Sequence, residues 1–249
     1  MPNDKLYLHE VIHIVGAGSE PYKQHTAERA ARGSSAPLVG MWQQSGSTGD
    51  WPKVINLWEM QGWDHWAELL EYQYATAKQP GELKSWWNKA LAWRSGGFDR
   101  ILEPAPFSPT REELVARGPK GVAFIQEIAT VRPGTADAYL ETVAARWAPV
   151  ASRRGMTLAG AWRTAMRDTE AVLLWCFPTY RAYTDHLKTW HTDRDAIAWA
   201  VAAREWRTDY RETLLVPSVW NVMHPKWPPA ASGTATRRSK RAVSRARKR

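Results

Sequence analysis

Hydrophobic and polar positions follow the same order twice along this chain. Each pass opens with a run in which apolar residues occur at both odd and even positions. Such a run predicts a strand covered on both faces. The first pass predicts strands at 5–15, 36–44, 51–60 and 99–103, and helices at 21–32, 62–77 and 83–96. The second predicts strands at 122–131, 157–164, 170–177 and 212–217, and helices at 136–155, 179–190 and 194–206. The order strand, helix, strand, strand, helix, strand is that of a ferredoxin-like unit.

The two passes also match residue by residue. A shift of 117 positions places Glu10 on Glu127 and Trp58 on Trp175, and the offset changes only where loops are expected. A long period that repeats once indicates two copies of a small domain and excludes a solenoid. We therefore predict a first ferredoxin-like α+β barrel repeat, a linker, a second such repeat and a flexible basic tail, at 1–107, 108–120, 121–222 and 223–249.

Short motifs carry a resemblance to a known family. They are VRPG at 131–134 before a helix containing Tyr139, LVGMW and LAGAW at 38–42 and 158–162, and VINLW and VLLW at 54–58 and 172–175. The chain resembles NIPSNAP-type members of the dimeric α+β barrel superfamily. The resemblance implies that two antiparallel ferredoxin-like sheets pair into a barrel with helices outside, and that a small-molecule pocket lies between sheet and helices. It also implies a homodimer as one expected assembly, and some relatives hold haem.

Charge and cysteine content limit the binding partners and the cellular compartment that we expect for this protein. The formal net charge is +9, but eight of the thirteen residues at 237–249 are Lys or Arg, which leaves about one net positive charge on the rest. Such a tail is typical of weak binding to polyanions such as nucleic acid. The single cysteine, Cys176, excludes an intrachain disulfide. We see no signal peptide or transmembrane segment and expect a cytoplasmic protein.

The chain contains 16 tryptophans and only four phenylalanines. Several tryptophans occupy matching places in both passes, among them Trp42 with Trp162 and Trp58 with Trp175. Packing shared by both copies explains this recurrence. The alternative is that aromatic walls line a pocket for a flat apolar ligand.

A carboxylate recurs in the middle of the opening strand of each pass, as Glu10 and Glu127. Burying a carboxylate without a partner is unfavourable. One interpretation is a general base or ligand anchor with a raised pKa. The other is a salt bridge to a duplicated arginine, either Arg29 with Arg146 or Arg94 with Arg207.

At several positions where the two passes differ, the more polar residue stands in the first pass. His9 corresponds to Gln126, and Asn56 corresponds to Leu173. We therefore predict the reactive pocket in the first copy, with His9 as proton acceptor or hydrogen-bond donor, oriented by Asn56. The predicted catalytic residues are His9, Asn56 and Glu10, and the predicted ligand-binding residues are Tyr7, His13, Trp42, Trp58 and Glu59.

No metal site is predicted. His9 and His13 lie four residues apart on a strand, about 13 Å, which is too far to share one zinc ion. We also expect no cofactor, although a haem held by one histidine is an alternative.

Three functional hypotheses follow. The first is a NIPSNAP-like protein that binds a small apolar or aromatic compound, with cofactor-independent monooxygenase, cyclase or isomerase chemistry as the enzymatic form of this hypothesis. The second is a non-catalytic interaction protein that binds nucleic acid or another polyanion through its basic tail. The third is a haem-binding relative. The first two rest on different parts of the chain, so removal of the tail distinguishes them.

Overall fold

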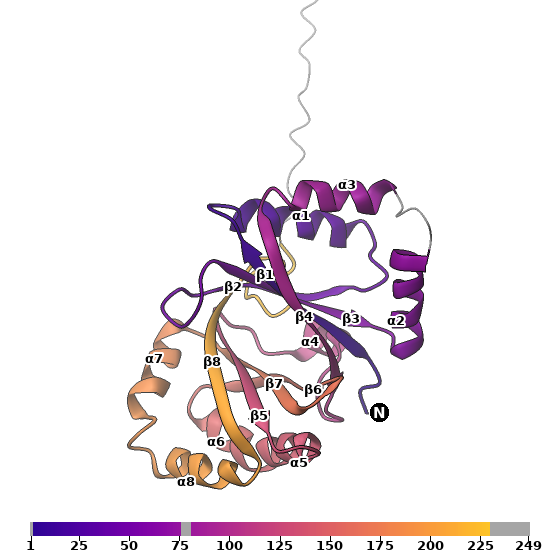
Figure 1. Ribbon diagram of the computed structural model, residues 1–249. Helices are drawn as coiled ribbons and strands as arrows, with labels where there is room; N and C mark the ends of the chain where they lie inside the picture. Colours follow the sequence, from indigo (N-terminus) through magenta and orange to yellow (C-terminus); the bar gives the residue numbers. More distant parts are fainter. Residues whose placement is uncertain (1, 76–80, 230–249) are drawn as a thin grey trace, which may run out of the picture.

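The alternating apolar runs form strands that close on themselves. In the computed structural model, which describes residues 2–75 and 81–229, eight strands make a closed barrel in the order β1-β3-β2-β8-β5-β7-β6-β4 (Figure 1). The strands are β1 (Leu6–Ile14), β2 (Leu38–Gln44), β3 (Lys53–Met60), β4 (Arg94–Pro104), β5 (Ala123–Val131), β6 (Thr157–Thr164), β7 (Arg167–Phe177) and β8 (Arg207–Pro217). All neighbouring pairs are antiparallel. The mixed α+β architecture therefore agrees with the sequence prediction.

The two halves of the chain contribute equivalent sheets. The first half, β1 to β4, has the order β4-β1-β3-β2, and the second half, β5 to β8, has the order β8-β5-β7-β6. They join where β2 pairs with β8 and where β4 pairs with β6. This is the ferredoxin-like strand order in each half.

Helices cover the outside of the barrel on opposite sides (Figure 1). The first half supplies α1 (Ser19–Ala31), α2 (Trp63–Leu70), the π-helical η1 (Glu71–Ala75) and α3 (Gly81–Ala90). The second supplies α5 (Ala136–Thr142), η2 (Val143–Trp147), α6 (Ala148–Arg153), α7 (Tyr180–Thr189), α8 (Arg194–Ala202) and η3 (Ala203–Glu205). None of the helices within residues 2–75 and 81–229 has the length and apolar character needed to cross a membrane.

Each strand therefore has an inner and an outer face, and in the opening strands β1 and β5 both faces are mostly buried. Side chains such as Tyr7, Trp42 and Phe124 fill the barrel interior. On the outer faces, Ile12 packs with Tyr22 of α1, and Ile125 packs with Tyr139 of α5. The prediction that the opening strands are covered on both faces is confirmed, because one face meets helices and the other meets the opposite sheet.

The recurring glycine and tryptophan of LVGMW and LAGAW have a packing cause. The indole rings of Trp42 and Trp162 lie over Gly40 and Gly160, where any Cβ would overlap the ring. Both indoles are almost completely buried, as is Trp175. Burial of each such side chain contributes roughly 1.5–3 kcal/mol, so the packing interpretation holds for these three tryptophans.

Two segments expected to lack structure are ordered. Within the predicted linker, α4 (Arg111–Arg117) begins at a capping box formed by Thr110 and Glu113 and buries Leu114. The predicted tail begins too early, because residues 223–229 pack against the barrel: Met223 is fully buried and Trp227 contacts the interior cluster. The basic segment at 237–249 lies outside the described residues.

Candidate functional site

The barrel separates the predicted site residues into two groups. Tyr7, His9, Trp42 and Glu59 face the interior, whereas Glu10, Asn56 and Trp58 face outward toward the helices. His13, near the end of β1, is exposed.

The prediction that Asn56 orients His9 is wrong. In the strand register Asn56 lies opposite Glu10, and His9 lies opposite Leu57. Side chains alternate between faces along a strand. Asn56 therefore lies on the opposite side of the sheet from His9.

Inside the barrel, His9 meets its counterpart from the other half. Its Nε2 is 2.9 Å from Oε1 of Gln126, and the imidazole is buried. The adjoining cavity, bordered by Trp42 and Trp162, has a volume of about 10 Å³. This is about the minimum that one water molecule requires. The interior around His9 is therefore packed and has no room for an aromatic ligand.

Burial makes His9 an acid-sensitive residue. Desolvation lowers the pKa of His9 to about 4, with a further contribution from Arg100. In the unfolded chain the imidazole takes up a proton near pH 6.5. Stability should therefore fall as pH drops from about 6.5 to 4, because the unfolded state binds more protons there. His9→Gln should reduce this loss in urea denaturation compared between pH 7 and pH 4; an unchanged pH dependence would contradict it.

Tyr7 and Glu59 anchor the connection between the halves. The Tyr7 hydroxyl donates to Glu59 at 2.9 Å, and the backbone N–H of Arg111 donates to the same oxygen at 2.5 Å. The Arg111 Nε also donates to the carbonyl of Leu38. Burial, and then Glu59, raise the pKa of Tyr7 well above its usual range. These contacts fix the start of α4 and occupy Tyr7 and Glu59, two of the five residues predicted to bind ligand.

The second half shows a closed polar network on its outer face. Glu127 accepts hydrogen bonds from Tyr139 at 2.7 Å, Arg207 at 2.8 Å and Trp175 at 3.3 Å. The Arg207–Glu127 ion pair is buried on both sides. For Glu127, the salt-bridge interpretation with Arg207 is confirmed.

The equivalent network in the first half is arranged differently. Glu10 accepts from the Asn56 amide at 3.0 Å and from the Trp58 indole at 2.7 Å. The same Asn56 nitrogen lies 3.1 Å from the Tyr22 hydroxyl, which is the counterpart of Tyr139. Two neutral groups thus support Glu10, and no cation pairs with it among the described residues.

Arg94, the counterpart of Arg207, lies nearby without engaging Glu10. Its guanidinium stacks on Trp87, 4.7 Å from the ring centroid, and Nη2 is 3.4 Å from the carbonyl of Gly96. Its Nη1 is buried with no protein partner, as is Oδ1 of the fully buried Asn56. Buried polar atoms are nearly always hydrogen-bonded. One donor atom of Arg94 and one acceptor atom of Asn56 therefore have no hydrogen-bond partner within the protein.

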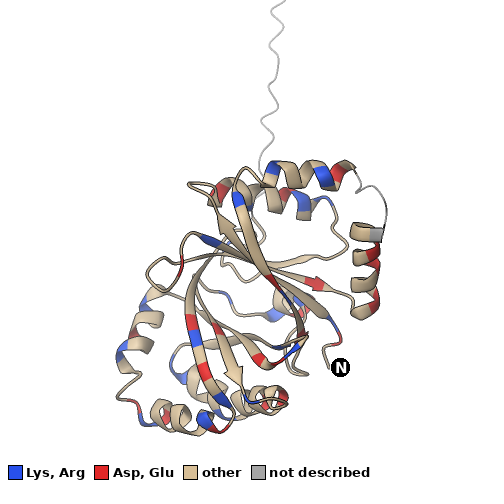
Figure 2. Ribbon diagram, viewed as in Figure 1, with Lys and Arg blue, Asp and Glu red and all other residues tan. Residues whose placement is uncertain are grey.

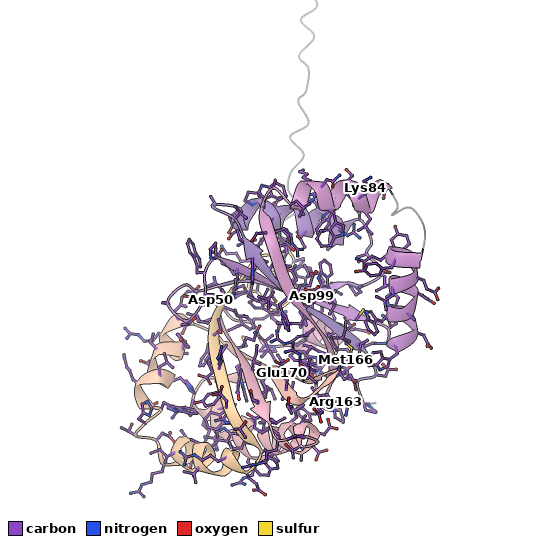
Figure 3. The ribbon with its side chains drawn as sticks, in the orientation of Figure 1. Asp50, Lys84, Asp99, Arg163, Met166 and Glu170 are labelled. Carbon is purple, nitrogen blue, oxygen red and sulfur yellow. The ribbon has the colours of Figure 1, made fainter. Side chains whose placement is uncertain are left out.

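A second carboxylate faces each central glutamate across the strand ladder. Asp99 lies opposite Glu10, midway along β4 (Figure 3), and Glu212 lies opposite Glu127. Water reaches both carboxylates, but surrounding protein removes part of their hydration. This desolvation and the neighbouring glutamate raise the pKa of Asp99 to about 6 and that of Glu212 to about 7.

Asp99 was not among the site residues predicted from the sequence. It stands at the start of the predicted strand at 99–103, whereas β4 begins at Arg94. The residues at 94–98 carry two glycines and no apolar alternation, so no periodicity signalled the extra pairing with β1. One signal in the sequence could have indicated Asp99. At an offset of 113 positions Asp99 matches Glu212, the acidic residue that lies opposite Glu127.

Solved structures with a similar fold share little sequence with this chain. A "putative monooxygenase" from Lactobacillus acidophilus NCFM superposes with a TM-score of 0.58 at 9% identity, covering 86% of this chain and 94% of that one. An anthrone oxidase-like protein gives 0.56 at 9%, covering 87% and 92%, and a "putative chlorite dismutase" gives 0.51 at 11%, covering 89% and 98%. These similarities show that the fold is shared with these proteins. No family model and no curated protein matches the sequence.

Proposed function

We propose that this dimeric α+β barrel protein is an acid–base enzyme that acts on a small apolar or aromatic compound without a cofactor. The observation that supports the proposal most is the outer-face site of the first half. There Glu10 lacks a cation, Asp99 titrates near neutral pH, and buried polar atoms of Arg94 and Asn56 lack partners. Two carboxylates that lie opposite each other on neighbouring strands, one of them with a pKa raised to about 6, form an arrangement suited to general acid–base chemistry.

Each residue of this site has a distinct proposed role. Glu10, held by hydrogen bonds from Asn56 and Trp58, accepts a proton from carbon or oxygen of the substrate. The free N–H of Arg94 donates to the oxygen on which negative charge develops, because a fixed donor stabilises such charge in a site shielded from water. Asp99 exchanges the proton with solvent, since its carboxylate remains in contact with water.

The substrate class follows from this chemistry and from the similar structures. A compound with an acidic C–H or O–H next to an aromatic ring or carbonyl supplies both the proton and the oxygen. The similar structures include proteins described as a monooxygenase and as anthrone oxidase-like. We therefore propose hydroxylated or carbonyl-bearing aromatic compounds, with oxygenation and isomerisation as the two reaction types to assay. The NIPSNAP-like relationship stays a prediction.

Asp99→Asn tests the acid–base role. The purified protein is assayed against anthrone-type and phenolic compounds by oxygen consumption and by absorbance between pH 5 and 8. In the native protein we expect the turnover rate to change with pH around 6, where Asp99 titrates. The variant should lose the change in turnover rate around pH 6 and should have a lower turnover rate. A native-like profile in Asp99→Asn would contradict the proposal, and Glu212→Gln, at the equivalent position of the second half, is the matched control.

His9, the histidine predicted to be catalytic, has no room for a haem beside it. His9 is buried, its Nε2 is engaged with Gln126, and the adjoining cavity measures about 10 Å³. A haem is many times larger. We therefore derive no step through haem, and the described residues hold no cluster of metal-binding side chains.

The interaction hypothesis rests on residues outside the described structure. Within the described part, acidic and basic side chains are interspersed over the helices (Figure 2). Because residues 223–229 pack against the barrel, truncation after residue 229 is the appropriate test. Polyanion binding that disappears on truncation while turnover persists would assign the two activities to separate parts of the chain.

A further inference from the structure

The two halves of this chain hold equivalent side chains in two different arrangements. Glu127, Tyr139 and Arg207 form a closed network in the second half. In the first half, the counterparts Glu10 and Tyr22 are bridged by Asn56, and Arg94 is turned away.

Arg94 lies close enough to the first-half network for its charge to affect that network. Its charge acts on both Tyr22 and Asp99, the two residues on which Glu10 also acts. Nevertheless the Arg94 Nη1 has no partner, whereas Nη1 of Arg207 lies 2.8 Å from Glu127. A half-buried cation close to a carboxylate would ordinarily pair with it, so the surrounding side chains hold the two apart.

Two substitutions between the halves explain the difference. Leu173 occupies the position of Asn56 opposite the glutamate and offers it no hydrogen bond, so Glu127 takes its donors from Tyr139 and Arg207. Asn56 instead donates to both Glu10 and the tyrosine hydroxyl. In the aligned sequences Ala200 matches Trp87, so the indole that stacks on Arg94 has no equivalent; Arg207 stacks instead on Tyr210, 3.8 Å from the ring centroid, while it pairs with Glu127.

We propose that Asn56 is a positioning residue which, with Trp87, keeps Arg94 from pairing with Glu10 and so holds the first-half site in an open state. The second half shows the closed state of the same network. The functional meaning of the open state rests on the function proposed above, since a glutamate neutralised by arginine is a poor proton acceptor. The structural claim stands independently of turnover.

A double-mutant cycle between Arg94 and Glu10 tests this proposal. The melting temperature is measured for Arg94→Met, Glu10→Gln and the double variant, first in the native protein and then in Asn56→Leu. In the native protein the two shifts should add. In the Asn56→Leu background they should become strongly non-additive, because Arg94 now pairs with Glu10. A crystal structure of Asn56→Leu should then place the Arg94 guanidinium within 4 Å of the Glu10 carboxylate.

Two further variants keep the test decisive. Trp87→Ala removes a half-buried indole from α3 and leaves Asn56 in place. Like Asn56→Leu, it should increase the coupling between Arg94 and Glu10. In the second half, Leu173→Asn should weaken the coupling between Arg207 and Glu127. Additive shifts in both Asn56→Leu and Trp87→Ala would overturn the proposal. If Asn56→Leu does not fold, the Trp87→Ala and Leu173→Asn cycles decide it.

These readouts separate the proposal from the proposed function. None of them uses a substrate, so a protein without acid–base activity can still show the expected coupling. Conversely, an active protein whose Arg94 and Glu10 remain uncoupled in both variants would retain the proposed function and lose the role assigned to Asn56.

Discussion

Arg207→Met should destabilise the protein by about 3–5 kcal/mol, the range for removing one partner of a buried ion pair. The guanidinium supplies a 2.8 Å bond to Glu127 and a 3.1 Å bond to Tyr139, and both charged side chains are nearly inaccessible to water. Without it, Glu127 keeps two neutral donors but loses its counter-charge. The free energy of unfolding, measured with urea at pH 7, is the appropriate readout.

Arg94→Met is the matched control for that experiment. Arg94 makes a stacking contact with Trp87 and one long hydrogen bond to Gly96, with no ion pair among the described residues. Its replacement should cost about 1 kcal/mol or less, the range for an exposed or partly buried cation–π contact. Equal losses from Arg94→Met and Arg207→Met would mean that the two networks are alike in solution, against the arrangement described above.

Glu10→Gln should lower turnover by about 10²–10⁴-fold, the usual contribution of a general base. The amide keeps the size of the side chain and an oxygen to accept from Asn56 and Trp58, but it cannot take a proton. Folding, measured by circular dichroism and melting temperature, should be preserved. Undiminished turnover in a folded Glu10→Gln protein would exclude Glu10 as the base.

Much of the fold was predictable because its signals are local. The order of strands and helices and the two-sided burial of the opening strands appear in the spacing of residue types, and the salt bridge of Glu127 to Arg207 was one of the alternatives that the sequence left open. The packed segment at 223–229 was not predictable, because its prolines and small residues indicate a flexible connection in the absence of tertiary contacts. Its order comes from the barrel against which Met223 is buried.

The candidate site was predictable only in part, because strand register decides which residues share a face. Alternation along β1 separates His9 from Glu10, but only pairing with β3 shows that Asn56 belongs with Glu10. A shift of one residue would have placed Asn56 beside His9, as the sequence analysis assumed. Asp99 depends on register in the same way, since it joins the site through its pairing with β1.

The contact between His9 and Gln126 has a consequence for how this barrel can vary. In a barrel built from two separate identical chains, residues that meet at the symmetry axis are copies of each other, and a histidine there would have to face a histidine. Linking both sheets in one polypeptide removes that restriction and allows unlike side chains to meet at the centre. One sheet can then acquire new chemistry while the other preserves the structure that supports both.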